Sequence, residues 1–218
     1  LAGDPRLYTT SLAVRDLEEV RAALGYSQVN LYGVSYGTRV AQHYLRRYPN
    51  RVRTMVLDGV VPPDLALGPR IPIDAQRALD ALFDRCANEA ACQKAFPQLR
   101  ESFAQLRTRL QEAPLEVTLA HPITAAPVDV RLGIPELNAA VRLLSYSDES
   151  ASILPLLIHE AQERSRPEVF AAQYEMIKRS MQEQLAYGMH FSVVCSEDAP
   201  RWKESDVDNE QLAATYMG

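Results

Sequence analysis

The sequence has little of what membrane-spanning and nucleic-acid-binding proteins need. No run approaches the roughly 20 consecutive apolar residues that cross a bilayer, and the longest, residues 153–158, has polar flanks. Lys and Arg total 23 against 28 Asp and Glu, and they are scattered along the chain, so no basic patch stands out. We therefore expect a globular protein whose partners include neither a membrane nor a nucleic acid.

Cysteine is also scarce, with three residues, Cys86, Cys92 and Cys195. The odd count leaves one thiol outside any pair within the chain. Cys86 and Cys92 close a short loop, where a disulfide would stabilise the fold by about 2 kcal/mol by restricting the unfolded chain. Two buried free thiols are the alternative. A zinc site would need further ligands, and no His or Cys stands at the required spacing, so we expect no metal.

Hydrophobic periodicity in the first 60 residues alternates between helix and strand. Residues 9–24 have the spacing of an amphipathic helix that stops at Gly25, and residues 29–34 form a short apolar run typical of a buried strand. A second helix is predicted over 36–48 and a second buried strand over 53–60. This order with short connections is typical of a parallel sheet with crossover helices. The fold class is therefore α/β, with a partial sheet in this chain.

Four prolines within residues 60–72 end this alternation and predict a domain boundary near residue 62. Beyond it the pattern is mainly helical with one hairpin. We expect helices within 74–112, 135–145, 150–164 and 167–188, a hairpin over 115–132, and a strand followed by an acidic turn over 190–198. The predicted organisation is a partial α/β core over 1–61, a mainly helical domain over 62–189, and a return segment over 190–218.

The sequence G-x-S-x-G ends the first predicted strand, with Gly33, Ser35 and Gly37 in the fixed positions. A sharp strand-to-helix turn exposes a serine hydroxyl as a nucleophile, and glycines are expected where side chains would press on the adjoining strand and helix. The backbone N–H of Tyr36, at the start of the next helix, would stabilise an oxyanion. The alternatives are an incidental serine in a loop and a phosphate-binding loop, but the third glycine or the lysine of such loops is missing.

A nucleophilic serine needs an imidazole base and a carboxylate that orients it. Four histidines follow the motif, and each is expected in a structural or solvated role, because none lies in a loop after a terminal sheet strand. They are His43, His121, His159 and His190. Asp58 ends the second predicted strand, where it either serves as the triad acid or, as we favour, binds backbone amides of the following turn.

With these residues in view, residues 8–63 strongly resemble the peptidase family S33 branch of α/β-hydrolases, which includes tripeptidyl and prolyl aminopeptidases. The cysteine pair with Phe96-Pro97, and Val194-Cys195-Ser196-Glu197-Asp198, resemble the cap of the secreted tripeptidyl-type members. The features that coincide in the first stretch are Tyr8-Thr9-Thr10, Asp16-Leu17, Leu24-Gly25-Tyr26, the SYGT after Val34, Tyr48-Pro49 and Leu57-Asp58-Gly59-Val60.

The resemblance implies an α/β-hydrolase core with an inserted helical cap. It also implies that Ser35 attacks peptides that have a free N-terminus, without a metal or organic cofactor. Glu197 and Asp198 are then candidates for binding the substrate's terminal ammonium, with a plain surface turn as the alternative. A periplasmic or secreted location is weakly favoured by the cysteine pair and the resemblance.

Family members also carry an HGGPG-like oxyanion loop, a triad Asp and a triad His outside the stretch that this chain covers. The chain does not begin with Met, and its first residues lack the basic and apolar regions of a signal peptide. We therefore expect a central slice of a longer chain, whose other segments would be its partners and would supply a cysteine for Cys195. A carboxylesterase-type acyl hydrolase and a non-catalytic binding module are the competing functions.

Overall fold

The computed structural model describes residues 4–121, 124–203, 205 and 207–218, which divide into two compact units. The first unit is made of the described parts of Leu1–Pro69 and Leu185–Val207, and the second of those of Arg70–Gln184 and Asp208–Gly218. The boundaries expected after residues 61 and 189 differ from this division, and residues 1–3 of the expected core lie outside the described residues. The proline-rich stretch stays with the first unit because the carbonyls of Val61 and Leu65 accept side-chain hydrogen bonds there.

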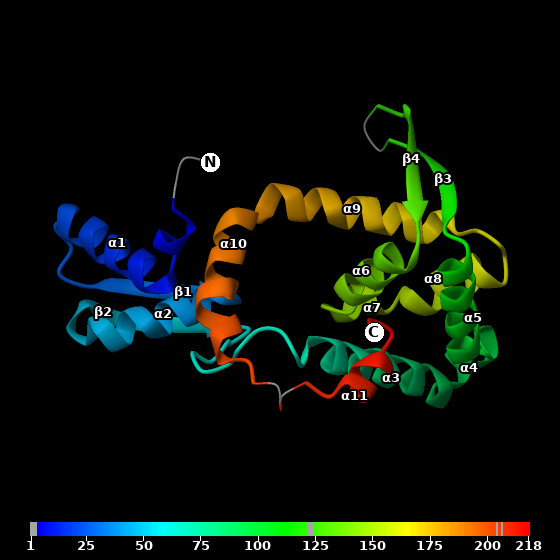
Figure 1. Ribbon diagram of the computed structural model, residues 1–218, viewed down its shortest axis with the longest axis horizontal. Coiled ribbons are helices and arrows are strands. Elements are labelled where there is room, and N and C mark those ends of the chain that lie inside the picture. The colour runs from blue at the N-terminus through cyan, green and yellow to red at the C-terminus, as the bar shows by residue number, and fades with distance from the viewer. Residues whose placement is uncertain (1–3, 122–123, 204, 206) are drawn as a thin grey trace. The chain divides into compact units, whose positions relative to one another are not determined.

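The first unit holds a parallel pair of strands, each preceded by a helix, as the periodicity predicted (Figure 1). Its elements before the proline-rich stretch are η1 (Pro5–Leu7), α1 (Thr10–Ala23), β1 (Val29–Val34), α2 (Tyr36–Arg47), η2 (Pro49–Arg51) and β2 (Val52–Asp58). Thr9 caps α1 by accepting a hydrogen bond from the backbone of Leu12. The helix stops at Gly25, whose φ of 73° lies in the left-handed region that favours glycine.

The strand predicted within 190–198 is wrong. The segment forms α10 (Tyr187–Val193), the π-helical turn η3 (Val194–Asp198) and the 3₁₀ turn η4 (Ala199–Arg201). A short apolar run fits a buried strand and a buried helix equally well by periodicity alone. Here the Ser192 hydroxyl donates to the carbonyl of Gly188, one helical turn earlier, and Val193 is buried, so the apolar residues pack from a helix.

Helices α1 and α2 are joined by a polar cluster around Glu18. The Glu18 carboxylate accepts hydrogen bonds from Arg21 on the same helix and from the hydroxyl of Tyr44 on α2, the latter at 2.6 Å. Tyr44 is fully buried, so its hydroxyl needs this acceptor. The cluster fixes α1 against the helix that follows Ser35.

The sheet of the first unit leaves apolar side chains in solvent. Tyr32 and Val34 of β1 and Val56 of β2 are exposed, Tyr32 by 68%. Strands of a parallel sheet are ordinarily buried on both faces. Exposed apolar side chains such as these are therefore atypical of a parallel sheet.

The second unit is mainly helical and contains the larger apolar core. Its elements are α3 (Ile71–Asn88), α4 (Ala90–Ala95), α5 (Leu99–Glu112), β3 (Leu115–Ala120), β4 (Pro127–Leu132), α6 (Ile134–Leu144), α7 (Asp148–Ala151), α8 (Leu154–Gln162), α9 (Glu168–Gln184) and α11 (Asn209–Ala213). The predicted hairpin is confirmed, with β3 and β4 antiparallel and Leu115 opposite Leu132. Residues 122 and 123 of its turn lie outside the described residues.

Cys86 of α3 and Cys92 of α4 form a disulfide, with their Cα atoms 5.1 Å apart. This confirms the favoured reading of the cysteine pair over two free thiols. Cys195 of η3 is a free, exposed cysteine in the structure, and its pairing with a cysteine elsewhere stays a prediction.

Among the helices of the described residues, none combines the length and apolarity needed to cross a membrane.

Candidate active site

Ser35 is the single residue between the end of β1 and the start of α2. Its backbone has φ 52° and ψ −119°, a region that L-residues rarely adopt and that stores strain. The Ser35 N–H donates a 2.9 Å hydrogen bond to the carbonyl of Asp58, the last residue of β2. The side chain is exposed. The turn thus presents a serine hydroxyl to solvent at the carboxyl ends of two parallel strands.

The two glycines of the motif differ in what they permit. A Cβ on Gly33 would stand 2.5 Å from the backbone carbonyl oxygen of Gly37 and 2.9 Å from the backbone nitrogen of Thr38, so only glycine fits there. A Cβ on Gly37 would meet nothing within 4 Å. The expected steric role therefore holds for Gly33 and is wrong for Gly37 in the described structure, because Gly37 lies on an open side of α2.

Thr38 holds the first turn of α2 and was not singled out from the sequence, although it closes the SYGT run. It is fully buried, and its hydroxyl donates at 2.6 Å to the carbonyl of Ser35, which also accepts from the Thr38 N–H. The same hydroxyl accepts from the backbone of Val61 at 2.8 Å. A threonine in the first turn after a candidate nucleophile is the signal that could have found this role.

Tyr36 begins α2, where helix geometry gives its backbone N–H no acceptor within the helix. Its phenol forms a 2.7 Å hydrogen bond with the hydroxyl of Thr10 at the start of α1. Burial is the largest cause that raises the pKa of the Tyr36 phenol, so this group stays neutral near pH 7. The Tyr36 side chain is thus bonded to α1, and its backbone N–H lies next to Ser35 at the start of α2.

Glu197 and Asp198, the candidates for ammonium binding, lie in η3 and not in a plain surface turn. The Glu197 carboxylate accepts hydrogen bonds from the backbone N–H of Thr10 at 2.5 Å and from its hydroxyl at 2.8 Å. Asp198 is 2% exposed and forms a 2.8 Å ion pair with Arg39 of α2. This geometry favours an internal counter-ion role for Asp198, whereas Glu197 is only partly buried and lies next to the partner of Tyr36.

Asp58 accepts a 3.2 Å hydrogen bond from the hydroxyl of Tyr32, which raises the pKa of that phenol. Its side chain is exposed, and no histidine of the described residues forms a hydrogen bond with it. The partner of the Asp58 carboxylate in the structure is therefore the Tyr32 phenol, and not a triad histidine or the backbone amides that we expected.

The histidines are dispersed over both units. In the first unit, neither His43 of α2 nor His190 of α10 hydrogen-bonds Ser35 within the described structure. Burial, as the largest cause, lowers the pKa of His43. In the second unit, His121 contacts Arg179 at 2.8 Å and His159 packs edge-on against Phe96. Within the first unit, therefore, no imidazole of the described residues hydrogen-bonds the serine.

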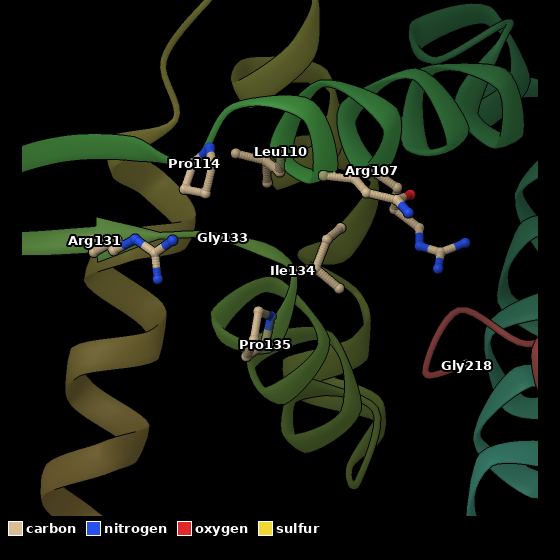
Figure 2. A pocket seen from close by; sticks show the side chains of 9 residues that line it. Arg107, Leu110, Pro114, Arg131, Gly133, Ile134, Pro135 and Gly218 are labelled. Atoms are coloured by element: carbon tan, nitrogen blue, oxygen red, sulfur yellow. The ribbon is translucent and has the colours of Figure 1, made fainter.

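Two cavities lie in the described residues, and Ser35 lines neither of them. In the first unit, about 240 Å³ lies between α1 and α2, lined by Ser11, Val14, His43, Arg46 and Arg47. In the second unit, Figure 2 shows a cavity of about 260 Å³ with Arg107 and Arg131 toward opposite ends and Leu110 and Ile134 between them. No group of three His, Cys, Asp or Glu side chains in the described residues could hold a metal ion.

Comparison with known proteins gives a family match and several relatives that are similar over part of the chain. Residues 3–131 match the family model described as alpha/beta hydrolase fold. Serine protease Hip1 of Mycobacterium tuberculosis is 38% identical over 86 residues, which are 36% of this chain and 16% of that protein. A tripeptidyl aminopeptidase of Streptomyces lividans is 49% identical over 55 residues, 25% of this chain and 10% of that protein.

The putative hydrolase YuaR of Escherichia coli is 36% identical over 110 residues, 47% of this chain and 22% of that protein. The chain therefore spans less than a quarter of the length of these curated relatives.

Proposed function

The chain belongs to the α/β-hydrolase fold family, and we propose that it supplies the nucleophile of a serine aminopeptidase of the S33 type. The strand-to-helix turn at Ser35 is then a nucleophile elbow. The observation that carries the proposal is the Ser35 backbone at φ 52°, held by Asp58, with the hydroxyl exposed. Such strain persists where the surrounding structure enforces it, and it clusters at active sites.

In this reaction the Ser35 Oγ attacks the carbonyl carbon of the scissile peptide bond. The Oγ–carbon bond forms while a base removes the hydroxyl proton and delivers it to the departing amine as the carbon–nitrogen bond breaks. Water then cleaves the acyl-enzyme ester. The N–H of Tyr36 stabilises the oxyanion, and the first turn of α2 adds the favourable end of its dipole. The base, its orienting acid and a second oxyanion donor come from other segments of the protein.

Peptides are proposed over esters because two relatives carry peptidase names, a tripeptidyl aminopeptidase and a serine protease. A substrate with a free N-terminus needs an anionic group near the nucleophile. Glu197 supports this role, since its carboxylate contacts Thr10, which in turn contacts the residue after Ser35. The exposed apolar side chains of β1 and β2 support the proposal that further segments of the same protein pack against this sheet. The disulfide supports a periplasmic or secreted location.

The proposed cap is the second unit, a separate mainly helical body that follows the proline-rich stretch. The chain enters this unit after β2 and returns to the first unit at α10, as at an insertion in an α/β core, and residues 208–218 then belong to the second unit again. The test is to express residues 70–184 joined by a flexible linker to residues 208–218, without the first unit, and to measure whether this protein folds and resists proteolysis. A fragment that remains unfolded would argue against an independent cap.

The nucleophile is tested on the full-length gene product with a fluorophosphonate probe and with a tripeptide amide that has a free N-terminus. We expect labelling and turnover in the wild type and the loss of both in Ser35→Ala, with turnover reduced on the order of 10⁶-fold. Ser27→Ala, which changes another exposed serine of the first unit, is the matched control and should label normally. Normal turnover by Ser35→Ala would refute the nucleophile.

Substrate class is tested on the same preparation. We expect the free tripeptide amide to be cleaved faster than its N-acetylated form, and Glu197→Gln to raise KM for the free form only. Preference for p-nitrophenyl esters with Ser35 still required would instead indicate a carboxylesterase. Absence of probe labelling in the wild type would indicate a non-catalytic module.

A further inference from the structure

Arg39 of α2 lies one helical turn after Ser35 and is almost completely buried, at 3% exposed. One guanidinium nitrogen, Nη1, donates to the carboxylate of Asp198 at 2.8 Å, and Nη2 donates to the carbonyl of Leu65. A buried cation in the first turns of this helix therefore depends on an anion 159 residues away in the sequence.

Such a pair is not explained by local helix stability. Removing two charges from water is costly, and apolar residues of similar size often stabilise a fold as well or better. The pair also joins three segments of the first unit, because Leu65 belongs to the proline-rich stretch and Asp198 to η3. In some proteins a buried polar or ionic pair instead defines the position and direction of the helix that carries it.

The neighbouring residue of η3 makes a second link to the same turn. Glu197 accepts from the backbone and the hydroxyl of Thr10, and that hydroxyl contacts the phenol of Tyr36. Both acids of η3 are therefore linked to the first turns of α2. Asp198 bonds directly to Arg39, and Glu197 bonds to Thr10, which contacts Tyr36. Ser35 and the N–H of Tyr36 are the groups that this turn orients.

We propose that Asp198 is a positioning residue for the serine nucleophile, acting through Arg39. By fixing α2 in its first turns, the ion pair sets the direction of the Ser35 hydroxyl and of the Tyr36 N–H. The proposal rests on the proposed function of Ser35. A displacement of about 1 Å in such groups costs on the order of 100-fold in rate, so the effect belongs in kcat more than in KM.

The test uses the full-length gene product and three variants, Asp198→Asn, Arg39→Gln and the double variant Arg39→Met with Asp198→Leu. Each is assayed for Tm, for kcat and KM on the free tripeptide amide, and for the rate of fluorophosphonate labelling. The double variant replaces the pair by apolar side chains, so it separates stability from position. Glu18→Gln is the control, since it weakens the contact between α1 and α2 at Tyr44, which lies beyond Arg39 on the side away from Ser35.

We expect kcat and the labelling rate to fall on the order of 10- to 100-fold in the single variants, with KM changed less than about threefold. The double variant should regain Tm but keep the low kcat, and Glu18→Gln should lower Tm with kcat unchanged. Recovery of kcat along with Tm in the double variant would overturn the proposal and leave a structural ion pair. Full turnover by Ser35→Ala would instead refute the proposed function, which separates the two failures.

Discussion

The backbone N–H of Ser35 donates to the carbonyl of Asp58 at 2.9 Å, so the residue that follows β1 is joined to the last residue of the neighbouring parallel strand β2. Val34 pairs with Asp58 in the sheet register, and the hydrogen bond of Ser35 continues that ladder by one residue. The ladder ends with the serine already in the left-handed region. These contacts use the backbone groups of Ser35, so the turn does not depend on the Ser35 hydroxyl.

Because the backbone at Ser35 is strained for an L-residue, glycine should be tolerated there better than alanine. Both Ser35→Gly and Ser35→Ala remove the hydroxyl, but only glycine adopts φ 52° at no steric cost. We expect Ser35→Gly to exceed Ser35→Ala in unfolding free energy by about 1 kcal/mol, measured by urea titration of both variants. An alanine variant as stable as the glycine variant would show that the turn relaxes and stores no strain.

The two glycines around Ser35 should respond in opposite ways to the same change. Gly33→Ala would force a Cβ to within 2.5 Å of the Gly37 carbonyl, so we expect a loss of more than about 2 kcal/mol in stability and of probe labelling. Gly37→Ala meets open space in a helix and should be neutral or stabilising by up to about 1 kcal/mol. Urea titration and probe labelling of the pair test this, and equal losses at both positions would contradict it.

Local pattern was sufficient for the part of the first unit that contains Ser35. The period of the apolar residues and the stop at Gly25 predicted α1, β1, α2 and β2, and the structure confirms their order. These elements are consecutive and connected by few residues, so neighbours in sequence are neighbours in space. The position of Ser35 between strand and helix followed from that order.

Contacts between segments that are distant in the sequence could not be predicted from local patterns. The run that contains Val193 and Val194 satisfies a strand pattern and a helix pattern, and only its packing in the first unit decides for the helix. The pairing of Arg39 with Asp198 has no local signal either, because the two residues are 159 positions apart and the sequence suggested a substrate ammonium or solvent as the partner of Asp198. The open surroundings of Gly37 likewise depend on what packs against α2 and not on the motif itself.

The cluster around Glu18 gives the stability a defined dependence on acid. Hydrogen bonding from Arg21, and then from Tyr44, lowers the pKa of Glu18 to about 2 from its ordinary value of 4.5. The Glu18 carboxylate therefore binds a proton less readily in the folded state than in the unfolded chain. Its contribution to the free energy of unfolding is present above pH 4.5 and is lost as the pH falls toward 2.

We therefore expect Glu18→Gln to flatten the decline of Tm between pH 4.5 and pH 2, measured by thermal unfolding across that range. Glu19→Gln changes the neighbouring carboxylate, which is 72% exposed, and serves as the charge-matched control. A wild-type slope in Glu18→Gln, or an equal flattening in Glu19→Gln, would place the acid sensitivity elsewhere in the protein.

Tyr216 offers a test of the core of the second unit. Its side chain is 2% exposed and packs edge-on against Phe103, but its hydroxyl has no hydrogen-bond partner among the described residues. Burial raises the pKa of this phenol to about 12, so the group is neutral, and the cost of its burial comes from the lost hydrogen bonds to water. Tyr216→Phe removes that polar atom and leaves the ring in place.

We expect Tyr216→Phe to raise the free energy of unfolding by about 1 kcal/mol, measured by urea titration with the slope unchanged. Tyr146→Phe is the control, because its side chain is 69% exposed and its change should stay within about 0.5 kcal/mol of zero. A loss of more than about 1 kcal/mol in Tyr216→Phe would mean that the hydroxyl has a buried partner, such as an ordered water, whose hydrogen bond outweighs the cost of burying the phenol.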